Sequence, residues 1–143
     1  MIVRTILANK VGEVATMLPD QPVMDAAMLL ASRQIGVVVV TTADNMVLGI
    51  LSERDIVRRL AEAGARVLDA PVRTVMTTDV AICSPDEPLD VIMRRMTTGG
   101  FRHLPAVSAG RLLGVISMGD VVKYNLDQME YVSRELNGYM LTA

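Results

Sequence analysis

Aromatic side chains, cysteine and histidine are scarce in this chain of 143 residues. Aromatics make up 3% of it, tryptophan is absent, and Cys83 and His103 are the one cysteine and the one histidine. A single cysteine excludes an intrachain disulfide and is typical of a reducing, cytoplasmic setting. A histidine without cysteines or acids at ligand spacing indicates no metal site. The core must therefore consist of aliphatic residues and some of the 11 methionines.

Neither sign of charge dominates, and no apolar run is long. Lys and Arg number 14 against 16 Asp and Glu, a net charge of −2. That balance argues against nucleic-acid binding, which needs a basic face to displace counterions. Apolar runs such as Val37–Val40 are far shorter than the ~20 residues that span a bilayer. Arg4 and Lys10 lie in a first segment without a long apolar block, so we expect neither a signal peptide nor membrane association.

The chain contains an internal duplication. Pro19-Asp20 returns as Pro85-Asp86 after 66 residues, and the block Leu48–Ser52 returns as Leu113–Ser117 after 65. A repeat of this kind decides the fold before any local pattern does. Two copies are too few for a solenoid. They are enough for a pseudo-symmetric pair in which each copy covers the apolar face of the other.

Each copy predicts the element order β-α-β-β-α, which makes an α+β fold with pseudo-twofold symmetry. A lead-in strand is followed by a helix that begins after a proline, by two strands joined by a turn, and by a helix that begins at a serine. The expected strands are Glu13–Met17, Val37–Val40 and Val47–Leu51 in the first copy and Asp79–Cys83, His103–Val107 and Leu112–Ile116 in the second. The expected helices follow Pro22 and Ser52, then Pro88 and Ser117.

The expected organisation has three parts. Residues 1–65 form the first repeat with an N-terminal arm, residues 66–74 form a linker, and residues 75–143 form the second repeat with an extended last helix. On that helix Met129, Val132, Leu136 and Tyr139 recur at steps of three and four. This spacing indicates a buried stripe, covered either by the body of the same chain or by a partner subunit, and it does not choose between them.

A serine followed three residues later by an aspartate opens the last helix of each copy, as Ser52 with Asp55 and as Ser117 with Asp120. The pattern is a capping box, which stabilises a helix by about 1 kcal/mol without any ligand. The same geometry suits a ligand, because a helix N-terminus attracts phosphate and an ionised aspartate accepts two hydrogen bonds from a ribose diol. Capping alone does not explain why a glycine precedes each serine by three residues.

The order of these blocks resembles the cystathionine-β-synthase (CBS) domain, present in tandem. The resemblance covers Val14–Leu60 and Val80–Asn125, and the segments Ser52–Arg58 and Arg102–Pro105 resemble the small stand-alone bacterial CBS pairs in particular. In that family the two units form a pseudo-twofold pair with clefts between them. These clefts commonly bind AMP, ADP, ATP or sometimes S-adenosylmethionine or a dinucleotide, and the pairs usually dimerise. The resemblance implies a homodimeric regulatory module that binds adenine nucleotide, requires no cofactor and regulates a protein that the sequence does not name.

The resemblance also implies the ligand-binding residues, position by position. Asp55 and Asp120 match the ribose-binding acids, and Ser52 and Ser117 match the hydroxyls beside them. The other matches line the base and phosphate region: Thr16, Ile35, Gly36 and Arg54 in the first copy, and Ala81, Ile82, Arg102 and His103 in the second. Because Ile82 replaces Thr16 and Gly119 replaces Arg54, we expect the two clefts to differ.

Two functional classes remain open on the sequence, and a third is rejected. The favoured one is the nucleotide-binding regulatory module, since no nucleophile with a neighbouring base, metal set or Walker-type loop is found, and no catalytic residue is expected. The alternative is a ligand-free homodimeric interaction scaffold in which the serine–aspartate pairs are only helix caps. IMP dehydrogenase, an enzyme that carries a CBS pair, is rejected because its barrel alone needs ~250 residues.

Overall fold

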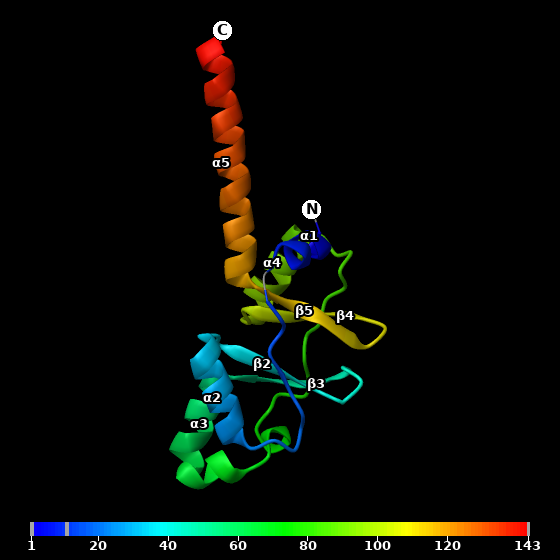
Figure 1. Cartoon of the computed structure of the whole chain (residues 1–143), viewed down its shortest axis with the longest axis vertical. Helices are drawn as coiled ribbons and strands as arrows, with labels where there is room; N and C mark the ends of the chain where they lie inside the picture. The colour runs from blue at the N-terminus through cyan, green and yellow to red at the C-terminus, as the bar shows by residue number, and fades with distance from the viewer. Residues whose placement is uncertain (1, 11, 143) are drawn as a thin grey trace.

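The structure is a computed structural model that describes residues 2–10 and 12–142, with the side chains of residues 139–142 left out. Two small α+β units lie one above the other, and a long helix rises from the second (Figure 1). The prediction of an α+β fold with two related repeats is confirmed.

The first unit is built on a three-stranded sheet. Strand β2 (Val37–Thr41) is central, with β1 (Thr16–Met17) parallel to it and β3 (Val47–Ser52) antiparallel. Helices α2 (Val23–Arg33) and α3 (Glu53–Ala63) join the sheet in one hydrophobic core. The valines Val38–Val40 are fully buried, as expected of a strand covered on both faces.

The second unit repeats this arrangement. Strands β4 (His103–Ser108) and β5 (Arg111–Ser117) pair antiparallel, and α4 (Leu89–Gly99) and the start of α5 (Met118–Thr142) pack with them. The lead-in segments are shorter than predicted: two residues form β1, and the second copy retains only the parallel bridge of Cys83 to Ala106.

The two units meet at their hairpin turns. The Asn45 amide nitrogen Nδ2 donates to the Leu112 carbonyl at 2.8 Å, and the Leu112 N–H donates to the Asn45 carbonyl at 3.0 Å. Met46 and Arg111 form an antiparallel bridge beside them. The turn of each copy thus extends the hairpin of the other, which fixes the two units edge to edge.

Each unit is completed by the segment that precedes the other one. Helix α1 (Val3–Asn9), at the N-terminus, places Val3 and Ile6 in the core of the second unit, and Arg4 pairs with Asp86 at 2.7 Å. The N-terminal arm therefore packs on the second repeat, although it precedes the first. The sequence gives no indication of this helix, since seven residues are too few to show a helical period.

The predicted linker has the corresponding role in the first unit. It forms two 3₁₀ helices, η1 (Ala65–Asp69) and η2 (Val72–Thr74), which bury Val67 and Val72 in the first core. Arg73 pairs with Asp20 at 2.9 Å, which repeats the pair of Arg4 with Asp86. The domain boundaries at 65 and 74 remain predictions.

These crossing segments explain the glycine that precedes each serine. A Cβ atom on Gly49 would lie 2.8 Å from the Thr77 carbonyl oxygen, and one on Gly114 would lie 2.6 Å from Cδ2 of Leu7. Both distances are shorter than a real Cβ contact. At Gly49 the obstacle is backbone, so only glycine lets the segment after η2 approach, whereas at Gly114 the end of the Leu7 side chain would have to shift. The glycine of the first copy is therefore a packing requirement.

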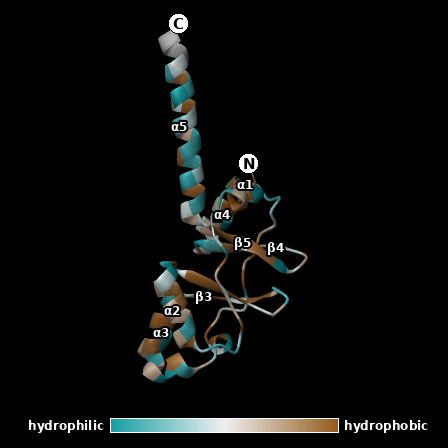
Figure 2. Cartoon of the chain, in the orientation of Figure 1, coloured by the Kyte–Doolittle hydropathy of each residue, from teal (hydrophilic) through white to brown (hydrophobic). Residues whose placement is uncertain are grey.

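Helix α5 leaves the body after its first turns. Val121 is buried, but Leu126, Met129, Val132 and Leu136 are 54%, 68%, 54% and 58% exposed. Figure 2 shows apolar patches along this projecting helix, interspersed with polar ones. Packing of this stripe on its own body is thus not observed, and cover by a partner remains a prediction; the Tyr139 side chain lies outside the described residues. No described helix has the length and apolarity needed to span a membrane.

Candidate functional site

Both serine–aspartate pairs form complete capping boxes. The Ser52 N–H donates to Asp55 Oδ2 at 2.9 Å and the Asp55 N–H donates to Ser52 Oγ at 3.1 Å. In the second copy the same bonds of Ser117 and Asp120 measure 2.9 and 3.0 Å. In each pair, Oδ2 of the aspartate accepts the cap hydrogen bond from the serine N–H, and Oδ1 takes no part in the cap.

The first N–H of each helix is also bonded. Glu53 donates its N–H to the Gly36 carbonyl at 2.9 Å, and Met118 donates its N–H to the Arg102 carbonyl at 2.8 Å. An anion at these helix ends would therefore find fewer backbone donors than a free N-terminus offers.

A cavity of about 820 Å³ collects residues from both units. Five of the predicted ligand-binding residues line it: Ile35, Gly36, His103, Ser117 and Asp120. Val14 and Ala15 of the first lead-in segment and Leu113 and Val115 of β5 supply apolar wall. In the structure Ile35 and Gly36, just before β2 of the first copy, thus face the same cavity as Ser117 and Asp120 of the second copy.

The other seven predicted residues do not line this cavity: Thr16, Ser52, Arg54, Asp55, Ala81, Ile82 and Arg102. Ala81 packs against the second core, and the Ile82 carbonyl accepts a hydrogen bond from Arg95 Nη2 at 2.7 Å. Their assignment to a ligand remains a prediction.

Two basic residues that line the cavity, Lys10 and Arg33, are not among the ligand-binding residues predicted from the sequence. Lys10 Nζ donates to Asp120 Oδ2 at 2.9 Å and to the Val115 carbonyl at 2.7 Å. Arg33 Nη1 donates to the Glu13 carbonyl at 3.1 Å. Lys10 follows α1 and lies in none of the sequence blocks that recur, so no repeated block indicates it. Arg33 ends α2, where a basic residue is usual and carries no signal of its own.

The charges around Asp120 affect two titrating groups. Burial by itself raises the pKa of the Asp120 carboxyl, but the hydrogen bonds from Lys10 and Ser117 outweigh it and hold that pKa below its usual value. Burial lowers the pKa of His103, and the positive charge of Lys10 lowers it further. The cavity therefore favours a charged aspartate beside a neutral imidazole.

The lowered pKa values of His103 and Asp120 both make the fold less stable in acid. Between the folded and the ordinary pKa the unfolded chain binds more protons, so the free energy of unfolding falls as pH drops below about 6.5 for His103 and below about 4 for Asp120. We expect Lys10→Met to raise the pKa of His103 toward its ordinary value.

The measurement is a proton NMR titration, in which the single histidine gives one imidazole resonance. Arg4→Met is the control, since it removes a cation from the same arm but outside the cavity. A His103 pKa that stays unchanged in Lys10→Met would show that the ammonium does not act on the imidazole.

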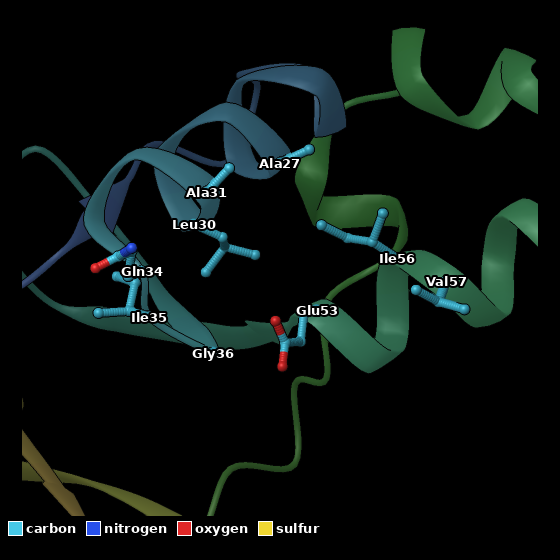
Figure 3. A pocket seen from close by; sticks show the side chains of 9 residues that line it. All are labelled: Ala27, Leu30, Ala31, Gln34, Ile35, Gly36, Glu53, Ile56 and Val57. Carbon is cyan, nitrogen blue, oxygen red and sulfur yellow. The ribbon is translucent and has the colours of Figure 1, made fainter.

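A second hollow of about 450 Å³ lies between α2 and α3 (Figure 3). Leu30, Ile56 and Val57 line it, and Glu53 is its one acidic residue. Gln34, Ile35 and Gly36 line both hollows, so the two adjoin. With an anionic and otherwise mostly apolar lining, this hollow suits a nucleotide less well than the cavity at Asp120.

Cys83 offers no reactive thiol to either hollow. It is buried, and burial raises the pKa of the thiol to about 11, which keeps it protonated. Among the described residues no group of three or more His, Cys, Asp or Glu side chains is placed to hold a metal ion.

The fold and its two serine-led helix starts define a duplicated α+β pair with a cavity shared by the copies. The chain belongs to the CBS-domain family, whose model, described as CBS domain, matches residues 4–62 and 72–127. Proteins of this family are generally regulatory modules. The prediction of a tandem CBS pair is confirmed.

Individual relatives agree with this assignment. The crystal structure of the CBS-domain containing protein ATU1752 from Agrobacterium tumefaciens is 44% identical, with a TM-score of 0.81 over 87% of this chain and 99% of that one. The CBS domain-containing protein YhcV of Bacillus subtilis is 32% identical over 91% of this chain and 87% of its own length.

Other relatives are less informative, because they are less similar or much longer than this chain. The CBS domain protein PAE2072 from Pyrobaculum aerophilum, solved in complex with AMP, is 24% identical, with a TM-score of 0.74 over 84% of this chain and 89% of that one, which shows the fold alone. Several curated relatives are longer, and the chain spans 23–39% of their length.

Proposed function

We propose that this chain is a regulatory module that binds an adenine nucleotide in the cavity at Asp120 and does not catalyse a reaction. The observation that carries the proposal is that Ser117 and Asp120 open into a cavity of about 820 Å³ instead of standing only as a helix cap. Ligand pockets for small molecules have volumes of about 300–1,000 Å³. The AMP complex of the similarly folded PAE2072 supports the same ligand class.

The lining groups suit the parts of a nucleotide. Asp120 uses Oδ2 for Lys10 and its cap, which leaves Oδ1 to accept from a ribose hydroxyl. The apolar wall of Ile35, Leu113 and Val115 suits the face of a base. Lys10 and Arg33 bring positive charge for phosphate.

The same groups do not form a catalytic set. Ser117 Oγ accepts the Asp120 N–H, and no hydrogen bond joins Ser117 to His103 in the part of the chain that the structure describes. A nucleophilic serine needs a base within hydrogen-bonding reach, and His103 does not provide one here. Binding without turnover is thus the function that these contacts support.

Isothermal titration with AMP, ADP, ATP and S-adenosylmethionine tests the proposal on protein freed of bound ligand. We expect saturable binding of at least one adenosine phosphate. No heat with any of the four would overturn the proposed function.

A homodimeric scaffold is the second candidate, and the exposed stripe on α5 favours it. A projecting helix is marginally stable in water unless its apolar face is covered, and a second copy offers the same stripe in a twofold arrangement. Light scattering with and without nucleotide separates the candidates: a dimer mass without any nucleotide binding supports the scaffold alone. The proposal of a regulatory module also includes a cytoplasmic location and a partner protein that the module regulates.

A further inference from the structure

Lys10 contacts the Asp120 carboxylate, which the proposed function assigns to ribose binding. Its ammonium contacts Asp120 Oδ2 at 2.9 Å and the Val115 carbonyl at 2.7 Å. The side chains of this pair are 40% and 25% exposed, so both charges are partly withdrawn from water. A sugar that binds Asp120 must either share the carboxylate with Lys10 or displace the ammonium.

The surroundings of Lys10 decide what displacement costs. Lys10 and Asp120 also line a neighbouring hollow of about 420 Å³, together with Lys123 and Asp127, so the pair stands where two cavities adjoin. In the large cavity the described charged groups are Lys10 and Arg33 against Glu13 and Asp120. Arg33 donates to a backbone carbonyl, and no ion pair of Arg33 is found among the described residues.

A neutral nucleoside gives Lys10 no replacement for the carboxylate of Asp120. If ribose hydroxyls occupy Asp120, they bring no charge, and the partly buried ammonium of Lys10 loses strength in its one carboxylate contact. A phosphate group on the same ligand restores a counterion, since lysine forms strong charge-assisted hydrogen bonds with phosphate. A ligand with a positive charge near the ribose would add repulsion.

From this geometry we propose that Lys10, contributed by the N-terminal arm, is a specificity residue that makes the Asp120 cavity select 5′-phosphorylated adenosine over uncharged adenosine or a cationic sulfonium nucleoside. The inference rests on the proposed function. It adds that the discrimination comes from a lysine of the N-terminal arm, which exchanges a carboxylate for a phosphate when the ligand enters.

The test compares AMP and adenosine by isothermal titration on wild-type protein and on Lys10→Met, which keeps the aliphatic stem and removes the charge. We expect wild-type protein to prefer AMP. In Lys10→Met the affinity for AMP should fall about tenfold, the value of one charge-assisted hydrogen bond, while adenosine binds equally well or better. The preference for the phosphate should then largely disappear.

Two matched variants make the result specific. Arg4→Met removes a cation and an exposed ion pair from the same arm but lies outside the cavity, so it should keep the wild-type preference. Lys10→Arg retains the charge and should restore most of it.

The outcomes are separable. Tighter binding of AMP and adenosine by the same factor in Lys10→Met would mean that Lys10 only obstructs the site, and unchanged affinity for both would mean that it does not contact the ligand; either overturns the inference and leaves the proposed function intact. Binding of neither ligand to wild-type protein would overturn the inference, and the proposed function itself would fall only if ADP, ATP and S-adenosylmethionine also gave no heat.

Discussion

We expect Ile6→Ala to lower the free energy of unfolding by about 2–4 kcal/mol, although Ile6 lies in an N-terminal arm that precedes both repeats in the sequence. Ile6 is 5% exposed and packs in the core of the second unit with Leu104, Ile116 and Val121. Truncation to alanine removes three carbons and leaves a cavity between α1 and the sheet. In a chain of this size the melting temperature should fall by about 10 °C.

Chemical denaturation with circular dichroism measures the change, and Arg4→Met is the control on the same helix. Arg4 is exposed and pairs with an exposed Asp86, so its loss should change the free energy of unfolding by less than about 1 kcal/mol. Val72→Ala tests the corresponding segment of the first unit and should also destabilise strongly, since Val72 is fully buried. If Ile6→Ala unfolds like wild-type protein, α1 does not complete the second core in solution.

The repeated part of the fold was predictable because the same physical pattern occurs twice. An apolar run such as Val37–Val40 predicts a strand buried on both faces, and a serine with an aspartate three residues later predicts a helix start. The capping boxes form as the sequence predicts. Because the two copies show the same pattern, each copy supports the strands and helices predicted for the other.

The crossing segments were not predictable from the same reasoning. Helix α1 and the 3₁₀ helices at 65–74 are short; α1 packs on the second repeat, which is distant in sequence, and the 3₁₀ helices pack back on the first repeat, where a linker was expected. Local periodicity cannot show a partner so distant in the chain. For the same reason Lys10 was missed: its contact with Asp120 joins residues 110 positions apart.

The composition of the cavity also depended on this arrangement. Sequence matching placed one set of ligand-binding residues in each copy, whereas the cavity joins Ile35 and Gly36 of the first copy to Ser117 and Asp120 of the second. The turn-to-turn contact of Asn45 with Leu112 holds the copies in this relation. Only the packing of the two units specifies which residues face each other.

Asp120→Asn should abolish most of the nucleotide-induced stabilisation, while Asp55→Asn should retain it. The two aspartates form capping boxes with nearly equal hydrogen-bond lengths, so both variants carry a similar capping cost of about 1 kcal/mol, and Asp120→Asn also loses the ion pair with Lys10. They differ in that Asp120 lines the cavity of about 820 Å³ and Asp55 does not. A neutral amide replaces the charged acceptor of the ribose hydroxyls, which we expect to weaken binding about 100-fold.

Thermal melting with and without AMP measures this difference. At a ligand concentration of about 100 times the wild-type Kd, binding stabilises the folded chain by about 2.7 kcal/mol, and a 100-fold weaker variant retains about 0.4 kcal/mol of it. The Asp55→Asn variant should melt lower than wild type without ligand and still gain the full shift with it. Loss of the shift in Asp55→Asn but not in Asp120→Asn would place the nucleotide at the other cleft. An equal loss in both would mean that the nucleotide depends on both helix starts rather than on the cavity at Asp120. The ligand-induced shift of each variant, taken relative to the same variant without ligand, thus separates ribose binding from helix capping and from the loss of the Lys10 ion pair.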